Sequence, residues 1–296
     1  MAAPTYFSVA PINPLYPDKN HALAEAFDIG NYVFVGPMSP WMREGDVLEG
    51  FGLRKEAFQK AEFAFVIETE DPTFAESDKR HNALRLANLS LWLARPTAIC
   101  FDIMVQGCRH GNQNRLLEKT PVVSPLGFLE VDANNSLGEC HLTTARQLNI
   151  AINSAPRPGP LWTAIRTLWA ALIQKWDGHY IFRWTALEAL FGSENRQKNS
   201  SARRHRLMAR FIEPDDDIAQ DNVIDVATDC YNWRCTLVHG RSMSEFNDPT
   251  SMRVSVKTQD LLLRVFRKIL LSEEYRQMFG DADRLEHFLD ALDAQL

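Results

Sequence analysis

The stretch YNWRCTLVHG, residues 231–240, carries an arginine and a histidine five positions apart, an R-x4-H element, at the expected end of a helix. Upstream, three aspartates at 215–217 follow Pro214 and supply the capping oxygens and negative charge that favour a helix N-terminus. Gly240 is the residue type that best tolerates the left-handed turn with which many helices end. The sequence therefore predicts one helix over residues 217–239.

Arg234 falls within the apolar stripe expected for this helix. The stripe steps by three or four residues, as one face of a helix requires, and is formed by Ile224, Ala227, Tyr231, Arg234 and Val238. Burying a guanidinium without a partner costs roughly several kcal/mol. We therefore expect Arg234 to meet a carboxylate, a phosphate or a protein interface.

A second predicted helix, over residues 179–192, has a carboxylate among apolar neighbours. Its stripe consists of Ile181, Trp184, Glu188 and Phe191. We predict that Glu188 pairs with Arg234. Such a pair has two interpretations, because buried ion pairs fasten helices together as well as marking sites of chemistry.

Three segments together resemble the HEPN domain, specifically its ApeA-like branch. They are WTALEALFG at 184–192, the basic helix that follows, and the stretch at 231–240, and both their order and their spacing agree with the family. The likeness covers roughly residues 160–295 and does not extend to the first 150 residues. It implies a helical bundle that commonly forms a homodimer, which brings the R-x4-H elements together in a cleft.

Many HEPN proteins are metal-independent endoribonucleases, so the resemblance implies an RNA substrate and no metal or other cofactor. His239 would act as general base or acid for the RNA 2′-hydroxyl, and Arg234 would hold the scissile phosphate. Glu188, Cys235 and Gly240 would support them. The products would be a 2′,3′-cyclic phosphate and a 5′-hydroxyl. The family also suggests a role in antiviral defence or stress response, with an unidentified regulatory partner.

The alternative is a catalytically silent HEPN module that serves dimerisation and partner binding. Cys235 stands where active members frequently have a small polar residue, and Arg241 stands where the branch controlled by nucleotidylation has a tyrosine. Five residues at about 100° each also place Arg234 and His239 roughly 140° apart on one helix, so we favour a dimer in which two chains complete the site. Outside the family, His239 would simply bond the last helix carbonyls.

The helix expected near 200–212 has a basic face that could bind RNA. Arg203, Arg206 and Arg210 recur at i, i+3 and i+7, and Arg204 and His205 join them. Arg241 is a further candidate for phosphate contact. The chain as a whole has a net charge of −6, so any RNA must be met by a local basic surface. A solvated helix face is the other interpretation of such a run.

The fold class expected is a mixed α+β domain followed by the all-α HEPN-like bundle. Three prolines and a glycine fall within residues 153–160 and predict a linker, which separates a domain at 1–152, with a possible sensor or recruitment role, from one at 161–296. Alternating apolar residues predict strands at 32–35, 63–67 and 99–105 in the first domain, with a helix at 79–95. In the second, further helices are expected at 161–177, 254–272 and 281–294.

Cysteine usage and hydropathy bear on location. Five cysteines form no regular framework and the N-terminus lacks a basic segment followed by an apolar one, which together favour the cytoplasm. No apolar run approaches the roughly 20 residues that span a bilayer, so no membrane association is expected. Cys108, His110, Cys140 and His141 could bind zinc if two loops met, although their spacing is not that of a standard finger.

Overall fold

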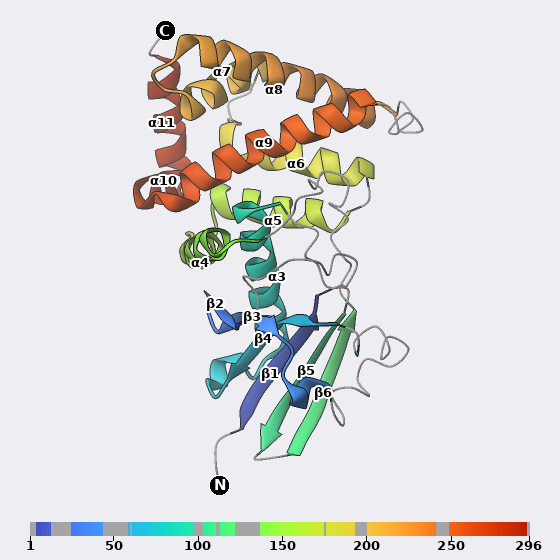
Figure 1. The fold of residues 1–296 in the computed structure, drawn as a ribbon. Helices are drawn as coiled ribbons and strands as arrows, with labels where there is room; N and C mark the ends of the chain where they lie inside the picture. Colours follow the sequence, from blue (N-terminus) through green and yellow to red (C-terminus); the bar gives the residue numbers. More distant parts are fainter. Residues whose placement is uncertain are drawn as a thin grey trace. The chain divides into compact units, whose positions relative to one another are not determined.

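The chain forms two compact units, Met1–Asn153 and Ser154–Leu296. The first is α+β and the second is helical, as the sequence predicts (Figure 1). The division falls at the start of the segment predicted to be a linker. The computed structural model describes residues 4–12, 25–43, 59, 61–96, 103–110, 113–121, 137–174, 176–192, 200–240 and 249–294.

The first unit is built on a six-stranded antiparallel sheet with the order β2-β3-β4-β1-β5-β6. The strands are β1 (Thr5–Pro11), β2 (Phe27–Gly30), β3 (Val33–Pro37), β4 (Phe63–Thr69), β5 (Ile103–His110) and β6 (Gln113–Pro121). The predicted strand at 63–67 is confirmed as β4. The strand predicted at 32–35 begins one residue later, because Asn31 and Tyr32 have φ values of 53° and 63° and form the β2–β3 turn. Ile99 and Phe101, predicted to begin the strand that ends in β5, lie outside the described residues.

Side chains on β1 alternate between two differently filled faces of the sheet. Phe7 and Val9 enter an apolar cluster that the short 3-10 helix η2 (Pro40–Arg43) closes, with Trp41 packed against it. Ser8, between them, points to the opposite face and meets Arg80 from helix α3. The first face therefore has an apolar cluster beneath η2, whereas the other contains a buried polar network.

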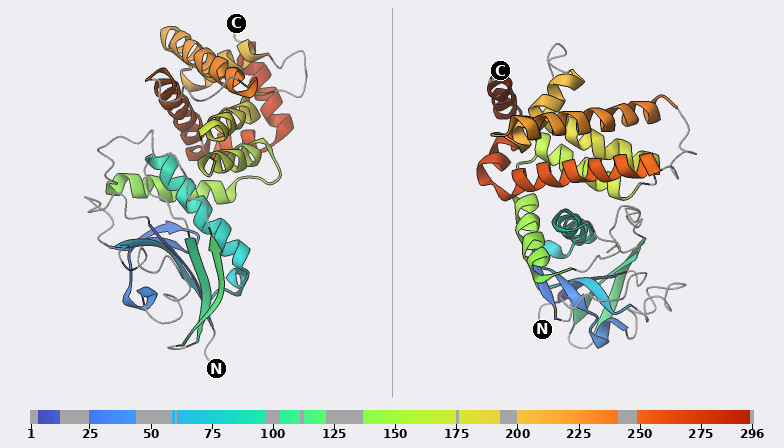
Figure 2. Two further views of the ribbon diagram at one scale, coloured as in Figure 1. Left: turned by 90° about the vertical axis from the view of Figure 1, so that its right-hand side faces the viewer. Right: turned by 45° about the horizontal axis from the view of Figure 1, so that its top comes forward.

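Helix α3 (Ser77–Ala94) lies against the sheet, which Figure 2 shows, and matches the helix predicted at 79–95. Its Arg80 is fully buried. Arg80 Nε donates to Gln106 Oε1 at 3.0 Å and to Ser8 Oγ at 3.2 Å, and Nη1 donates to the carbonyls of Phe74 and Ala75. These four hydrogen bonds all go to neutral oxygens, and those to Ser8 and Gln106 fasten α3 to two strands.

Helix α4 (Glu139–Ser154) was not among the predicted elements. Its buried Asn149 donates through Nδ2 to the carbonyls of Ile29 and Gly30, at 3.2 and 3.1 Å. Those carbonyls belong to the end of β2, so one side-chain amide fixes α4 to the sheet. No described helix in either unit is both long enough and apolar enough to span a membrane.

The second unit is a helical bundle in which α6 is central and contacts α5, α7, α8 and α9. Its helices are α5 (Pro160–Leu172), α6 (Trp176–Phe191), α7 (Ser201–Ile212), α8 (Asp217–Val238), α9 (Pro249–Leu271), α10 (Glu273–Gly280) and α11 (Ala282–Asp293). The single helix predicted at 161–177 is wrong. The helix stops at Leu172 and Trp176 begins α6, because α6 has its own apolar residues to bury and packs against α5.

We predict that Arg80→Met lowers the free energy of unfolding by about 2–4 kcal/mol, because Gln106 and two backbone carbonyls lose their charged donor inside the core. Urea denaturation measures this change. Lys79→Met is the matched control one residue earlier in α3. The Lys79 side chain is 50% exposed and lies 3.8 Å from Glu76, so its loss should change stability by no more than about 0.5 kcal/mol. Equal effects of the two substitutions would contradict the structural role of Arg80.

Candidate functional site

The R-x4-H element occupies the last turn of α8 and the residue that ends it. The Asp216 side chain accepts a hydrogen bond from the Ala219 N–H at 2.9 Å and caps the N-terminus as expected. At the other end, the His239 N–H donates to the Cys235 carbonyl at 3.0 Å, and Gly240 follows with a φ of 79°. The helix is therefore one residue shorter than predicted, and His239 is its C-cap.

Only the first part of α8 lies in the core. Its buried residues are Val223, Ala227 and Cys230, and none of the described residues that follow in this helix is buried. Val238 is 47% exposed, so its assignment to the apolar stripe is wrong, since the helix leaves the core before reaching it. Arg234 consequently stands at the edge of the bundle, with 24% of its side chain exposed.

The predicted pairing of Glu188 with Arg234 is confirmed. Arg234 Nη2 donates to Glu188 Oε2 at 3.4 Å, which links α8 to α6. The sequence did not predict the third member of this group. Arg204, from α7, places its Nη2 atom 3.4 Å from the other oxygen of the same carboxylate, Oε1. One carboxylate therefore joins three helices.

The aromatic ring of Tyr231 packs beneath this cluster of charged side chains. Arg204 lies over its ring, with 5.6 Å between the guanidinium carbon and the ring centroid, and Trp184 and His205 pack against the same ring. A side-chain hydrogen bond with Cys235, followed by burial, raises the pKa of the Tyr231 hydroxyl. Cys235 thus belongs to the cluster through its contact with Tyr231, one helical turn away.

His205 is a second histidine of the cluster, and the sequence placed it only beside the basic face proposed to bind RNA. It is only 3% exposed, and its Nδ1 atom lies 3.0 Å from Thr228 Oγ1. Burial and the neighbouring Arg204 charge lower its pKa to about 4. An imidazole held neutral by these surroundings packs edge-on against Trp184 and stabilises the junction of α6, α7 and α8.

His239 is exposed at the open end of α8. Among the contacts of the described residues, none joins it to Arg234. A single chain therefore presents a half-buried cation and a solvent-facing imidazole on neighbouring parts of one helix end. The arrangement leaves His239 accessible to a substrate or to a second copy of the chain.

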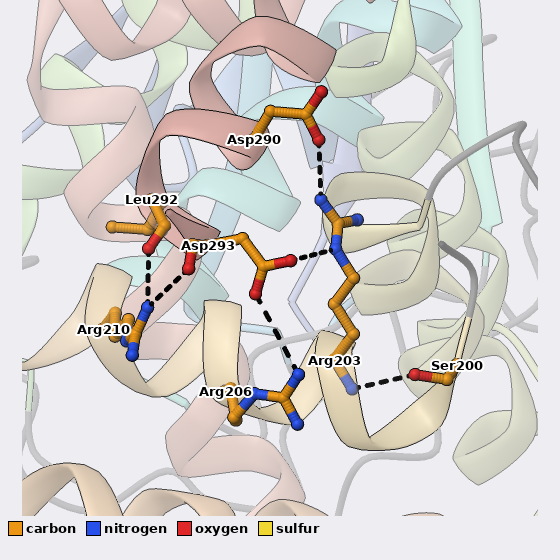
Figure 3. Close-up of polar contacts among 7 residues, drawn as sticks. All are labelled: Ser200, Arg203, Arg206, Arg210, Asp290, Leu292 and Asp293. Carbon is orange, nitrogen blue, oxygen red and sulfur yellow. Dashed lines mark hydrogen bonds and ion pairs between the residues drawn. The ribbon is translucent and has the colours of Figure 1, made fainter. Parts of the chain in front are cut away.

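The basic face of α7 is used largely inside the protein, as Figure 3 shows. Arg203 is 5% exposed and pairs with Asp290 at 3.0 Å and Asp293 at 2.8 Å, both on α11. Arg210 Nη1 donates to the carbonyls of Leu292 and Asp293, at 2.7 and 3.3 Å. The expectation that Arg203 and Arg210 contact RNA does not fit these positions, because α11 occupies their donors.

Arg206 remains more available than its two neighbours. Its side chain is 39% exposed and its Nη2 atom lies 4.0 Å from Asp293 Oδ1, a weak contact. Arg204 points the other way, toward α6 and α8. Arg241 lies outside the described residues. Of the arginines of α7 that were proposed to bind RNA, two therefore bind α11 and a third, Arg204, belongs to the Glu188 cluster.

The candidate zinc ligands do not form a site among the described residues. Cys108 is buried in β5, Cys140 is exposed on α4, and His141 Nδ1 accepts a hydrogen bond from the Gly138 N–H at 3.0 Å. The side chain of His110 lies outside the described residues. Within the described part of the chain, no three His, Cys, Asp or Glu side chains are grouped so as to hold a metal ion.

Comparison with models of known families, with curated proteins and with solved structures finds no match to this chain. The cluster around Glu188 is therefore interpreted from its own geometry. The signals that could have revealed Arg204 and Tyr231 were present in the sequence. Arg204 is one residue, or about 100°, away from Arg203 and must face a different neighbour, and Tyr231 precedes Arg234 by one turn.

Glu188→Gln should lower the free energy of unfolding by about 1–2 kcal/mol, because two half-buried guanidinium groups lose their shared negative charge. Chemical denaturation followed by circular dichroism tests this value. Asp229→Asn is the control, since Asp229 on α8 also lies 3.4 Å from its partner Lys257 but is 61% exposed. We expect a change within about 0.5 kcal/mol for the control. A Glu188 effect no larger than that of Asp229 would show that the cluster does not stabilise the bundle.

The stability of the protein should fall as the pH is lowered from 6.5 to 5. The pKa of His205 in the folded protein is about 4, below its ordinary value of 6.5, so the unfolded chain binds the extra proton in this range. The contribution is complete above pH 6.5 and is lost toward pH 4, at up to about 1.4 kcal/mol per pH unit. Burial lowers the pKa of His179 to about 2 and adds to the same trend.

The measurement compares denaturation curves across this pH range. His205→Gln should reduce the slope of unfolding free energy against pH by up to the contribution of one bound proton. Identical slopes for the wild type and His205→Gln would contradict the burial of a neutral imidazole at this position.

Proposed function

We propose that the helical unit is a HEPN domain of the ApeA-like branch and that the protein is a metal-independent endoribonuclease. The observation that supports this most directly is the state of Arg234. Its side chain is 24% exposed, it makes one 3.4 Å contact with Glu188, and its buried Nε atom has no hydrogen-bond partner among the described residues. The Nε donor is buried and out of reach of a ligand, so the four N–H donors of the two Nη groups, one of which meets Glu188, are those suited to phosphate oxygens.

The proposed reaction is an internal attack within RNA. His239 takes the proton of a 2′-hydroxyl, the 2′-oxygen attacks the adjacent phosphorus, and the bond from phosphorus to the 5′-oxygen breaks. Protonated histidine then returns a proton to the leaving 5′-oxygen. Arg234 binds the non-bridging oxygens and stabilises the charge that develops on them. The products are a 2′,3′-cyclic phosphate and a 5′-hydroxyl.

A second copy of the chain completes this site in our proposal. His239 is exposed beyond the end of α8, whereas Arg234 is turned toward α6. Two helix ends related by a twofold axis would place Arg234 of one chain beside the partner's His239. In this arrangement the α+β unit recruits or senses, in the setting of antiviral defence or stress in the cytoplasm.

One observation favours the alternative of a catalytically silent HEPN module for dimerisation and partner binding. Arg234 already has a carboxylate partner, and His239 occupies the C-cap, where histidine commonly interacts with the last helix carbonyls. In a silent module, pairing with Glu188 and ending α8 would be the whole role of the motif. Cys235, which contacts Tyr231, would then serve packing alone.

Incubation of purified protein with single-stranded RNA in excess chelator tests the enzymatic function. The wild type should release fragments that end in a 2′,3′-cyclic phosphate, identified by mass spectrometry. Arg234→Ala and His239→Ala should each reduce the rate by at least about a hundredfold, the usual effect of losing a general base or a charge-stabilising group.

The controls are an exposed arginine and an exposed histidine that have no part in the cluster. Arg166→Ala on α5 and His287→Ala on α11, both exposed, should cleave at the wild-type rate. Cleavage that persists equally in all five proteins would identify a contaminant and would remove the enzymatic proposal. Absence of cleavage in the wild type, with dimers still formed, would favour the silent module.

A further inference from the structure

Glu188 lies between two guanidinium groups at equal distances. Its Oε1 atom is 3.4 Å from Arg204 Nη2, and its Oε2 atom is 3.4 Å from Arg234 Nη2. A strong charge-assisted bond is about 2.7–2.9 Å long, and an arginine alone with a carboxylate commonly forms two parallel bonds. Arg234 has only one long contact with Glu188. The carboxylate is therefore divided between two competitors.

Arg204 is the more firmly held of the two cations. Its side chain is 11% exposed, it lies over the Tyr231 ring, and α7 is tied to α11 through Arg203 and Arg210. Arg234, in contrast, stands where α8 has left the core. Arg204, which is held in place, and Arg234, at the edge of the bundle, compete for the Glu188 carboxylate. The strength of the Arg204 interaction therefore determines how tightly Glu188 binds Arg234.

We infer that Arg204 is a positioning residue that keeps Arg234 available to phosphate by competing for Glu188. When the Arg204 charge is absent, both oxygens of Glu188 can close on Arg234 as a two-bond fork and neutralise it. The identity of the phosphate as RNA rests on the proposed function. The competition among the three side chains does not.

This competition predicts a reversal when two substitutions are combined. Arg204→Met removes the cation but keeps an apolar stem over Tyr231, so Arg234 should be withdrawn by Glu188. Adding Glu188→Gln to Arg204→Met removes the carboxylate that withdraws it, so Arg234 should be released again. A purely structural role for Arg204 predicts no such reversal. The double variant would then be at least as destabilised as Arg204→Met, and Arg234 would not return to its wild-type availability.

Labelling with an arginine-selective dicarbonyl reagent measures the availability of Arg234 without any RNA. Peptide mass spectrometry gives the labelling rate at each arginine of the full-length protein. We expect Arg234 to label about tenfold more slowly in Arg204→Met, equivalent to about 1.4 kcal/mol, and to recover in Arg204→Met/Glu188→Gln. Arg206, whose contact is with α11, should label at one rate in every variant that retains it and serves there as the internal control.

Two control variants, and one replacement for Arg204→Met, complete the test. Arg206→Met removes a neighbouring cation of α7 that does not touch Glu188, so Arg234 labelling should stay at the wild-type rate. Arg204→Lys keeps a cation and should stay within about threefold of it, whereas Arg204→Gln replaces Arg204→Met if the latter does not fold. Thermal unfolding confirms that each compared variant is folded. Labelling that is unchanged or faster in Arg204→Met, or that does not recover in the double variant, overturns the inference.

RNA cleavage by the same proteins separates this inference from the proposed function. If the wild type cleaves, the rates should follow the labelling, with a loss in Arg204→Met and rescue in the double variant. If the wild type does not cleave, the nuclease proposal fails, while the labelling reversal still supports the role of Arg204. Cleavage that falls in Arg204→Met without rescue would overturn the role of Arg204 and leave the nuclease proposal standing.

Discussion

The carboxylate of Glu188 holds the junction of three helices in the second unit. It meets Arg204 from α7 and Arg234 from α8, and around it Tyr231 packs against Trp184 and His205. Partly buried charged side chains are tolerated at the edge of a bundle when each has a partner of opposite charge. Desolvation of an isolated ion would cost more free energy than its packing contributes. The same group that joins the helices therefore also sets the electrostatic state of the proposed catalytic arginine.

Local patterns predicted most helices and the one long-range contact that follows from charge. A carboxylate and a guanidinium in two apolar stripes have few ways to be satisfied, so the pairing of Glu188 with Arg234 could be derived without coordinates. The break between α5 and α6 could not. The apolar period continues through residues 161–177, and only the need of α6 to pack against α5 makes the chain turn there.

The arginines of α7 show why a charge pattern alone cannot assign a partner. From sequence, the face formed by Arg203, Arg206 and Arg210 is equally suited to phosphates, to water and to carboxylates of the same chain. Asp290 and Asp293 lie more than eighty residues away, and no local rule brings them to this face. Burial of Arg203 by α11 decides the matter, and it depends on the tertiary arrangement that sequence periodicity does not reveal.

Helix α8 reaches beyond the core that secures it, with its last buried residue at Cys230. The exposed side chains at this end, such as Val238 and His239, contribute little to folding, since few packed neighbours are lost when they change. Substitutions at these exposed positions would therefore change what this helix end binds while the bundle stays folded, with little loss of stability. An evolutionary path between the proposed nuclease and a scaffold would run through this helix end.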